Sequence, residues 1–344
     1  MQYRMLQRGS LHAHDGRLIE TGYATSLIKT YDRARIKAPK WRIKEWDYYL
    51  VASDSFALAL TVADNGYMGL DSVSLMDFDV PSTHTASRMS FFPMGKKGLP
   101  ATSQSGSVRA HGKGYELTFK TEDGQRQLYG HIYDFTGPND PLLFDIVLSE
   151  PKQDSMVIVT PFAGKPRAFY YNQKINCMPA QGRVIHGEKE YIFSPASSFG
   201  TLDWGRGVWT YNNTWYWGSA SGIVDGLPFG MNLGYGFGDT SAATENMLFY
   251  GGVAYKLEQV IFDIPMKGGR EDWLSPWRIR DDADRLNLCF DPIIDRYDKT
   301  DFKLLSSVQH QVFGRFSGWA QLDGSTRLNI SNLTGFAEKV SNKW

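Results

Sequence analysis

Turn dipeptides recur along this chain, and they constrain its fold more than any other feature of the sequence. Asp-Gly, Asn-Gly or Gly-Gly pairs begin at residues 15, 65, 123, 225, 251 and 323, and most lie between stretches rich in Val, Ile, Thr, Tyr and Phe. Such pairs adopt the left-handed backbone conformations that tight hairpins require. The stretches beside them, such as FALALTVAD (56–64) and YELTFKT (115–121), are therefore predicted to be strands.

Helical periodicity is weak by comparison. Apolar residues nowhere keep an i, i+3, i+4, i+7 spacing over a dozen residues, and SLIKTYDRARI (26–36) is the nearest short candidate. The chain is predicted to be mainly β and antiparallel, with few short helices. At 344 residues such a chain must close or stack its sheets, which gives a sandwich or one or two barrels. We place a domain boundary near residue 222, between domains 1–222 and 223–344.

Charge and composition argue against several classes of partner. Lys+Arg and Asp+Glu both number 37, so the chain as a whole lacks the net positive charge that attracts a nucleic acid backbone or an anionic membrane. No window approaches the roughly 20 apolar residues of a membrane span, and the N-terminus lacks the apolar run of a secretion signal. We therefore expect a cytoplasmic protein with no membrane span.

Cofactor motifs are missing from the sequence. It contains no GxGxxG, Walker or GxSxG motif and no HExxH. The two cysteines, Cys177 and Cys289, stand far apart and outside any metal-binding spacing, so we expect free thiols. No cofactor and no metal is predicted, and a small molecule or an oligosaccharide is the expected ligand.

The stretch DWGRGVWTYNNTWYWGSASG (203–222) is unusually rich in aromatic residues. If one strand runs straight through it, alternation puts five side chains on one face: Trp209, Tyr211, Asn213, Trp215 and Trp217. A hairpin turn at Asn212-Asn213 is the alternative. The rings form either a core or the wall of a cavity. Asp203 and Arg206 are either an ion pair or part of a site, where burial among rings would favour the neutral, proton-donating form of the acid.

The next stretch, FGMNLGYGFGDTSAATENMLFY (229–250), has one strand face made mostly of glycine. Asn232 shares that face, whereas Tyr235 lies on the opposite, apolar face. A glycine face indicates strong bending or the close approach of another strand, a ring or a ligand. Asp239 and Glu245 follow, and paired carboxylates are what acid–base chemistry requires.

Other candidate residues carry weaker signals. His12 and His14 lie on one side of an extended segment, as metal ligands do, but a solvated loop is the commoner arrangement near a terminus. Lys174 lies between apolar positions and could pair with one of the acids. His310 is either a base or a hydrogen-bonded structural histidine.

Four segments of the chain resemble a bacterial family catalogued as domain of unknown function 2804. They are YYNQKINCMPAQG (170–182), residues 203–222, residues 232–250, and HQVFGRFSG (310–318) with LNISNLTGFAEKV (328–340). The resemblance extends over nearly the whole chain.

A more distant likeness is to the carotenoid hydratase (hydroxyneurosporene synthase) and related lipocalin-like two-domain proteins, which include Diels-Alderase-type cyclases. The family's order of a paired-tyrosine strand, a short glycine hairpin and a Trp-x-Asp-x-x-Trp element is followed by Tyr170-Tyr171, by residues 182–187, and by Asp203 with Trp204 and Trp209. Thr201 and Leu202 stand where that element has its leading Trp-x. The segment around Gly335 and Glu338 is similar to that group's last barrel strand. The resemblance implies two lipocalin-like, calycin-type barrels with a ligand cavity in or between them, and Asp203 as proton donor.

Three functions are compatible with these features. The first is an enzyme that hydrates, isomerises or cyclises an apolar or semi-polar small molecule, with Asp203 as the acid assisted by Arg206, Asp239 and Glu245. The second is a glycoside hydrolase or lyase that uses the same acids, and the third is a non-catalytic carrier. Substrate contacts are expected from Trp204, Trp209, Tyr211, Asn213, Trp215, Trp217, Asn232, Tyr235 and Lys174.

Overall fold

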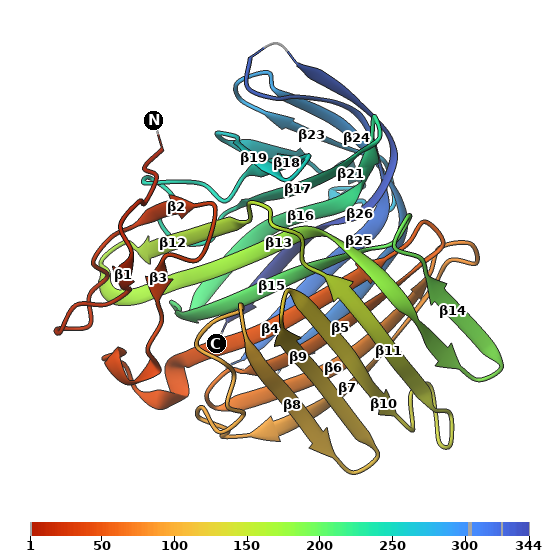
Figure 1. Ribbon diagram of the computed structural model, residues 1–344, viewed down its shortest axis with the longest axis horizontal. Helices are drawn as coiled ribbons and strands as arrows, with labels where there is room; N and C mark the ends of the chain where they lie inside the picture. The colour runs from red at the N-terminus through yellow and green to blue at the C-terminus, as the bar shows by residue number, and fades with distance from the viewer. Residues whose placement is uncertain (1, 302–304, 325, 344) are drawn as a thin grey trace.

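Antiparallel strands make up most of the molecule, which we describe from a computed structural model of residues 2–301, 305–324 and 326–343. Two large curled sheets hold nearly all of the strands (Figure 1). The predicted mainly β fold with two curved sheets and few short helices is confirmed. Within these residues, no helix is long and apolar enough to cross a membrane.

The first sheet has the strand order β7-β6-β5-β4-β15-β13-β11-β10-β9-β8, with β2, β12 and β14 attached through β12 and β13. Its strands are β2 (Gly22–Ala24), β4 (Ile43–Ala52), β5 (Phe56–Asp64), β6 (Met68–Asp77), β7 (Ser82–Phe91), β8 (Gly106–Gly112), β9 (Tyr115–Glu122), β10 (Gln125–Ile132), β11 (Leu142–Ser149), β12 (Met156–Phe162), β13 (Lys165–His186), β14 (Lys189–Phe193) and β15 (Phe199–Val208).

The second sheet has the order β19-β18-β17-β16-β26-β25-β24-β23-β20. Its strands are β16 (Asn212–Val224), β17 (Leu227–Tyr235), β18 (Met247–Tyr250), β19 (Val253–Lys256), β20 (Val260–Asp263), β23 (Trp277–Asp281), β24 (Leu286–Asp301), β25 (Ser306–Gln321) and β26 (Arg327–Lys343). Two short pairs complete the fold: β1 (Gly9–Ser10) with β3 (Lys29–Thr30), and β21 (Met266–Lys267) with β22 (Arg270–Glu271).

Hairpin turns form where the dipeptides predict them. Asp123-Gly124 joins β9 to β10 and Asp225-Gly226 joins β16 to β17, and both residues of each pair have positive φ. The helix candidate at 26–36 contains only β3 and the single 3-10 turn η1 (Arg33–Arg35), which Asp32 caps by accepting a hydrogen bond from the Ala34 amide.

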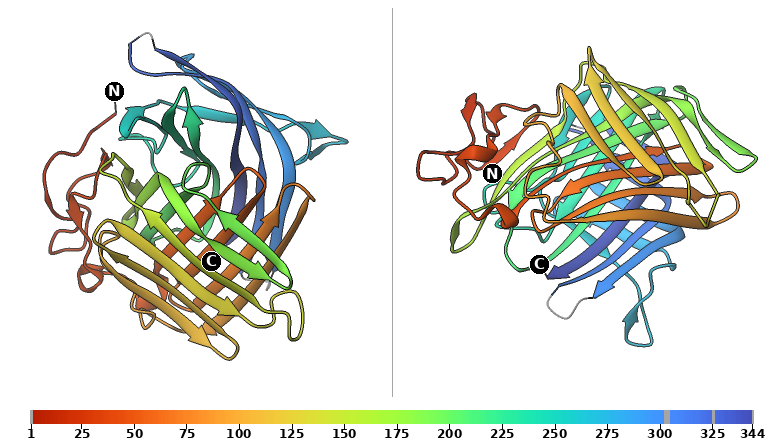
Figure 2. Two further views of the ribbon diagram at one scale, coloured as in Figure 1. Left: turned by 45° about the vertical axis from the view of Figure 1, so that its right-hand side comes forward. Right: turned by 90° about the horizontal axis from the view of Figure 1, so that it is seen from below.

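Each sheet curls round a core of its own. Ala86 on β7 and Val108 on β8 stand at opposite edges of the first sheet, yet they belong to the same buried cluster. Alternation along β5 separates the two faces: Leu58 and Leu60 enter that core, whereas Ala59 packs toward the second sheet. The outer faces of the two sheets therefore pack against each other, with Ala59 of the first sheet and Trp217 of the second in one buried cluster. Figure 2 shows the two sheets from two further directions.

The chain passes from the first sheet to the second between Val208 and Asn212. Residue 222 lies inside β16, so the change of sheet comes about ten residues before the expected boundary. The division into two independent domains stays a prediction.

Candidate functional site

Residues 203–222 do not form one straight strand, so the prediction of a single aromatic face is wrong. β15 ends at Val208, β16 begins at Asn212, and the two strands lie in different sheets. Asn213 stabilises the turn between them: its Nδ2 donates to the Thr210 carbonyl (2.7 Å) and its Oδ1 accepts from Thr210 Oγ1 (2.9 Å). The alternative prediction, a turn at Asn212-Asn213, comes closer.

Alternation along β15 separates Asp203 from its predicted neighbours. Asp203 faces the second sheet, whereas Trp204 belongs to the core of the first sheet and Arg206 is completely buried. Trp204 and Arg206 do not line the cavity that holds Asp203. Their predicted roles in substrate binding and catalysis are therefore wrong.

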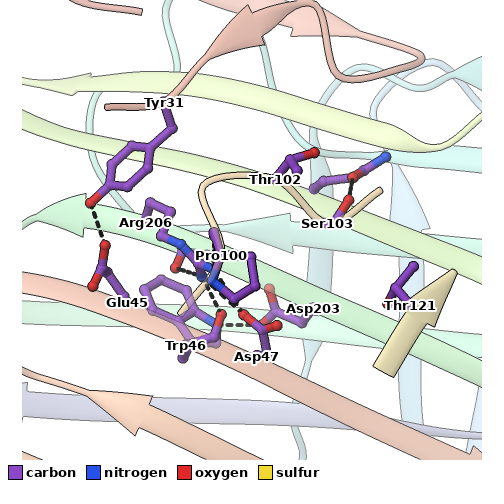
Figure 3. A network of polar contacts seen from close by, with 12 residues as sticks. Tyr31, Glu45, Trp46, Asp47, Pro100, Thr102, Ser103, Thr121, Asp203 and Arg206 are labelled. Atoms are coloured by element: carbon purple, nitrogen blue, oxygen red, sulfur yellow. Dashed lines mark hydrogen bonds and ion pairs between the residues drawn. The ribbon is translucent and has the colours of Figure 1, made fainter. Parts of the chain in front are cut away.

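Arg206 is part of a buried polar network within the first sheet (Figure 3). Both terminal guanidinium nitrogens donate to Asp47 Oδ1 at 3.0 Å, and further bonds reach the carbonyls of Trp46 and Pro100 at 2.8 Å. Burial raises the pKa of Asp47, and the contact with Arg206 opposes that rise. The partner of Arg206 is thus Asp47 and not Asp203, and the pair joins β4, β15 and the loop at Pro100.

A cavity of about 340 Å³ lies between the two sheets. Strands β4, β5, β6, β7, β13 and β15 of the first sheet and β16, β24, β25 and β26 of the second contribute to its wall. The lining side chains are Trp46, Tyr48, Thr61, Ala63, Asn65, Leu70, Ser72, Thr85, Ser87, Tyr170, Lys174, Asp203, Trp209, Trp215, Trp217, Phe237, Glu245, Arg296, Tyr297, Asp298, Ser307, Gln309, Gln311, Glu338 and Val340. Of the predicted residues, the cavity brings together Asp203, Glu245, Lys174, Trp209, Trp215 and Trp217.

Asp203 is held by hydrogen bonds from two side chains. Asn172 Nδ2 donates to Oδ1 at 2.5 Å, and Trp46 Nε1 donates to Oδ2 at 3.2 Å. The ammonium of Lys174 lies 4.0 Å from Oδ1. The carboxyl oxygens of Asp203 therefore accept both hydrogen bonds and lie near a cation.

Lys174 links the acids of the cavity. Its Nζ donates to Glu245 Oε2 at 2.7 Å and to the Tyr170 hydroxyl at 3.1 Å, and it lies 4.7 Å from the centre of the Trp217 ring. Burial lowers the pKa of Lys174, but Glu245 and Asp203 outweigh that effect and raise it overall. The amine stays charged, and the prediction that Lys174 pairs with an acid is confirmed.

Two acids that line the cavity, Glu338 on β26 and Asp298 on β24, are absent from the predicted site, and Glu338 is the buried one. Its Oε1 accepts a hydrogen bond from Trp215 Nε1 and its Oε2 accepts one from Gln311 Nε2, both at 3.0 Å. Burial raises the pKa of Glu338 to about 7, and the hydrogen bond from Trp215 only partly offsets this. A signal was present in the sequence, since Glu338 shares a strand face with Phe336 and Val340.

A chain of hydrogen bonds runs from Glu338 to a second cation. Gln311 accepts from Arg296 Nε at 2.9 Å, and Arg296 also donates to Ser74 Oγ at 2.9 Å. Gln311 Nε2 lies 3.5 Å from the hydroxyl of Tyr48, whose pKa burial raises to about 12. No motif in the sequence indicated Arg296, Gln311 or Tyr48. Arg296 and Gln311 lie opposite each other on β24 and β25, whereas Tyr48 is 263 positions away from Gln311 in the sequence.

Several predicted site residues lie elsewhere, and within the described ranges they do not line the cavity. Hydrogen bonds from the side chain of Ser241 and from its amide, the latter at 3.0 Å, lower the pKa of Asp239. Tyr211 is 49% exposed. Tyr235 stacks on Tyr216 with ring centres 4.4 Å apart. These positions, like the turn position of Asn213, are corrections to the prediction.

Asn232 supports the cavity wall from behind. Its Oδ1 accepts from Trp217 Nε1 at 2.7 Å, and its Nδ2 donates to the Glu245 carbonyl at 2.8 Å. It is completely buried and does not face the cavity. The predicted contact of Asn232 with substrate is therefore wrong, and its side chain instead positions Trp217 and Glu245.

The glycine face of β17 permits close packing, as predicted. A Cβ atom on Gly230 would lie 2.6 Å from Cys177 Sγ, and one on Gly234 would lie 2.7 Å from the Glu245 carboxyl carbon. The approaching groups are thus β13 of the first sheet and Glu245 itself. Gly234 makes room for the cavity acid.

The histidines take no part in the cavity. His12 is buried edge-on against Phe169, and burial lowers its pKa to about 4, so the expected solvated loop is wrong for this residue. His310 Nδ1 lies 2.7 Å from Asp295 Oδ2, and its ring stacks on Trp273, as a structural histidine does. The described part of the chain holds no cluster of three or more His, Cys, Asp or Glu side chains placed to bind a metal ion.

Comparison with known proteins supports the fold. The model of the family described as domain of unknown function (DUF2804) matches residues 2–344, which confirms the predicted family, and a search of curated proteins found no match. A crystal structure from Nitrosomonas europaea, of a protein given the name AttH, is similar with a TM-score of 0.53 and 12% identity, over 93% of this chain and 98% of that one. At that identity the similarity concerns the fold alone.

Two weaker structural similarities cover nearly the whole chain. Kievitone hydratase from Nectria haematococca has 11% identity and a TM-score of 0.49, over 98% of both chains. A protein named CghA has 10% identity and a TM-score of 0.47, over 98% of this chain and 97% of that one.

Proposed function

Because the chain belongs to the DUF2804 family, whose description names no activity, we propose a function from the cavity itself. The protein is an enzyme that transfers protons to and from a small, largely apolar molecule bound between the two sheets. The observation that carries this proposal is Glu338, a buried acid with a pKa of about 7 that faces the same cavity as Asp203. Two carboxyl groups that face one cavity in different surroundings suit the roles of acid and base near neutral pH.

Glu338 is the proton donor in this proposal, and Asp203 is the acceptor. This reverses the role that the sequence suggested for Asp203. Asp203 has hydrogen-bond donors and the ammonium of Lys174 beside it, whereas burial favours the protonated form of Glu338. Lys174 and Glu245 form an ion pair in the wall of the cavity.

The reaction we propose begins with transfer of the Glu338 proton to one carbon of an alkene. The alkene electron pair forms the new C–H bond and leaves a cation on the neighbouring carbon. Water then attacks that cation while Asp203 removes the water proton, which gives hydration, or Asp203 removes a proton from an adjacent carbon, which gives isomerisation. Attack by a second alkene within the substrate closes a ring and leaves the cation on that alkene's other carbon, and removal of a proton from an adjacent carbon by Asp203 completes cyclisation.

The aromatic wall supports a cationic intermediate. Trp46, Trp209, Trp215, Trp217 and Tyr170 line the cavity, and each ring face can stabilise a cation by about 0.5 to 2 kcal/mol. The binding energy of these rings also suits an apolar skeleton.

Glycoside cleavage is the second candidate function. Asp203, Glu245 and Glu338 face one cavity and not opposite sheet faces. The first-sheet wall carries the hydroxyls of Thr61, Ser72, Thr85 and Ser87, and Ser307 faces the cavity from the second sheet. These features suit a sugar. A simple carrier is less well supported, because burying charged groups is costly, and the cavity of a carrier for apolar ligands does not require the four acids, the lysine and the arginine that line this one.

The test begins with native mass spectrometry of the purified protein, which identifies the class of any ligand that copurifies. Alkenes of that class, or a panel of prenylated phenols, terpenoids and unsaturated fatty acids, are then incubated with the enzyme in D₂O. Deuterium incorporation or addition of water is the expected product signal. The rate should fall as the pH rises above about 7, because Glu338 must be protonated to donate.

Variants separate the candidate functions. Glu338→Gln and Asp203→Asn should each lower the rate by at least about a hundredfold, whereas Asp239→Asn, an acid outside the cavity, should retain it. Equal rates in the wild type and Glu338→Gln would contradict the proposal. Release of p-nitrophenol from a glycoside panel would favour the second candidate, and a tightly bound ligand that is never converted would favour a carrier.

A further inference from the structure

Four large apolar side chains are exposed together at one end of the first sheet. They are Trp41 (51% exposed), Phe91 (77%), Phe92 (61%) and Met94 (36%), and we call them the apolar tip. The tip combines the 3-10 turn η2 (Lys40–Arg42), the turn after β5 and the loop after β7 (Figure 1). An isolated exposed ring is common on a protein surface, but a contiguous group marks an interaction site.

Backbone contacts hold the parts of the tip together. The Phe92 amide donates to the Tyr67 carbonyl at 2.8 Å, and the Met94 amide donates to the Gly66 carbonyl at 3.0 Å. A side chain on Gly66 would collide with the Trp41 carbonyl, so η2 packs directly against this turn. Hydrogen bonds and close packing therefore fix the segments of the apolar tip relative to one another.

Phe92 and Met94 hold strained backbone conformations. Their φ angles are 51° and 48°, in the left-handed region that bulky side chains rarely adopt. Neither side chain is buried, so side-chain packing does not offset the conformational energy of the strained backbone. Strain that turns apolar groups toward solvent points to a functional surface.

The tip continues the wall of the cavity. Alternation along β7 puts Thr85 and Ser87, which line the cavity, on the same face as Met89 and Phe91. Met89 lies opposite Leu70, which also lines the cavity. An apolar strip therefore runs from the cavity to the tip.

Two exposed lysines flank the apolar tip in the sequence. Lys40 precedes Trp41 and Lys96 follows Met94, and both lysines are exposed. The nearest acid in the turn, Asp64, is completely buried and accepts hydrogen bonds from the amides of Gly66 and Gly95. Exposed rings flanked by lysines match the interface of an anionic bilayer, where rings enter among the headgroups and lysines contact the phosphates.

We propose that the apolar tip docks on anionic lipid membranes. Phe91, Phe92 and Met94 enter the headgroup region, Trp41 lies at its boundary, and Lys40 and Lys96 contact lipid phosphates. Docking places the open wall of the cavity beside the bilayer, so that an apolar ligand can pass between them along Met89 and Phe91. The passage of substrate rests on the proposed function, whereas docking itself does not.

Sedimentation with vesicles tests this proposal. The full-length protein should bind vesicles of phosphatidylcholine with 30% phosphatidylglycerol more tightly than vesicles of phosphatidylcholine alone, and added salt should weaken the binding. The double variant Phe91→Ser/Phe92→Asn should lower affinity by at least about tenfold. Asparagine tolerates the left-handed conformation at position 92, so this variant should fold. Lys40→Glu and Lys96→Glu should each lower affinity by about fivefold or more.

Matched controls lie on the far hairpins of the first sheet. Ile192→Ser removes an apolar side chain that is 65% exposed on β14, and Lys113→Glu reverses an exposed charge between β8 and β9. Neither should change vesicle binding, and all variants should keep the wild-type melting temperature.

Three results would overturn the proposal. They are no binding of the wild type to either vesicle, equal loss of binding in the tip variants and the controls, and a concentration-dependent dimer that the tip variants abolish without any vesicle binding. The last result would assign the tip to a second copy of the chain. Because none of these measurements uses turnover, they leave the proton-transfer proposal to its own test.

Discussion

Replacing Glu338 by glutamine should change how the stability of this protein depends on pH. The folded protein raises the pKa of Glu338 from its ordinary value of 4.5 to about 7, chiefly because the side chain is buried. Between these two values the folded chain binds a proton that the unfolded chain has lost. The free energy of unfolding therefore falls as pH rises through this range, and glutamine, which does not titrate, removes that dependence.

The size of the effect follows from the same pKa. The stabilisation is fully present below pH 4.5 and is lost as pH rises through about 7. Between pH 5 and pH 8, linkage predicts a loss of about 2 to 3 kcal/mol in the wild type relative to Glu338→Gln. Any fixed cost of burying the amide is the same at both pH values and cancels.

Urea unfolding at pH 5 and pH 8 measures the difference. We expect the gap between the variant and the wild type to shift by about 2 to 3 kcal/mol in favour of the variant at pH 8. Glu188→Gln, at an exposed turn between β13 and β14, is the matched control and should track the wild type at both pH values. If the stabilities of Glu338→Gln and the wild type stay parallel, Glu338 does not hold a proton near neutral pH and the proposed donor is wrong.

Two further changes test the packing around the cavity. Lys174→Met leaves the carboxylates of Glu245 and Asp203 without their shared cation, so it should destabilise the fold by about 3 to 5 kcal/mol in urea unfolding; a loss below about 1 kcal/mol would show that solvent screens these acids. Gly230→Ala places a methyl group 2.6 Å from Cys177 Sγ and should cost about 1 to 3 kcal/mol, whereas Gly137→Ala, with no atom within 4 Å, should stay within about 0.5 kcal/mol of the wild type.

Secondary structure was largely predictable because its signals are local. A hairpin at Asp123-Gly124 or Asp225-Gly226 depends on two residues that accept positive φ and on the alternating strands beside them. The one helix candidate failed for a related reason: eleven residues without a sustained apolar stripe have no face to bury, and only a 3-10 turn capped by Asp32 formed.

The site was predictable only in part. Asp203, Glu245 and the tryptophans could be named because acids and rings occur close together in the sequence. Reading residues 203–222 as one strand, however, placed Tyr211 and Asn213 on the wrong surface, because the break at residues 209–211 sends β15 and β16 into different sheets. Which face of β15 meets the second sheet also decided that Asp203 lines the cavity and Arg206 does not.

Local sequence determines which residues of this protein form strands, where they turn, and which side chains share a strand face, since these depend on backbone geometry over a few residues. The tertiary structure alone decides which faces meet. Glu338 lies on the second sheet and faces a cavity whose opposite wall includes Tyr48 and Asp203 of the first sheet, and no local pattern specifies that encounter. Burial raises the pKa of Glu338, because a carboxyl group becomes a proton donor near neutral pH only when it is removed from water.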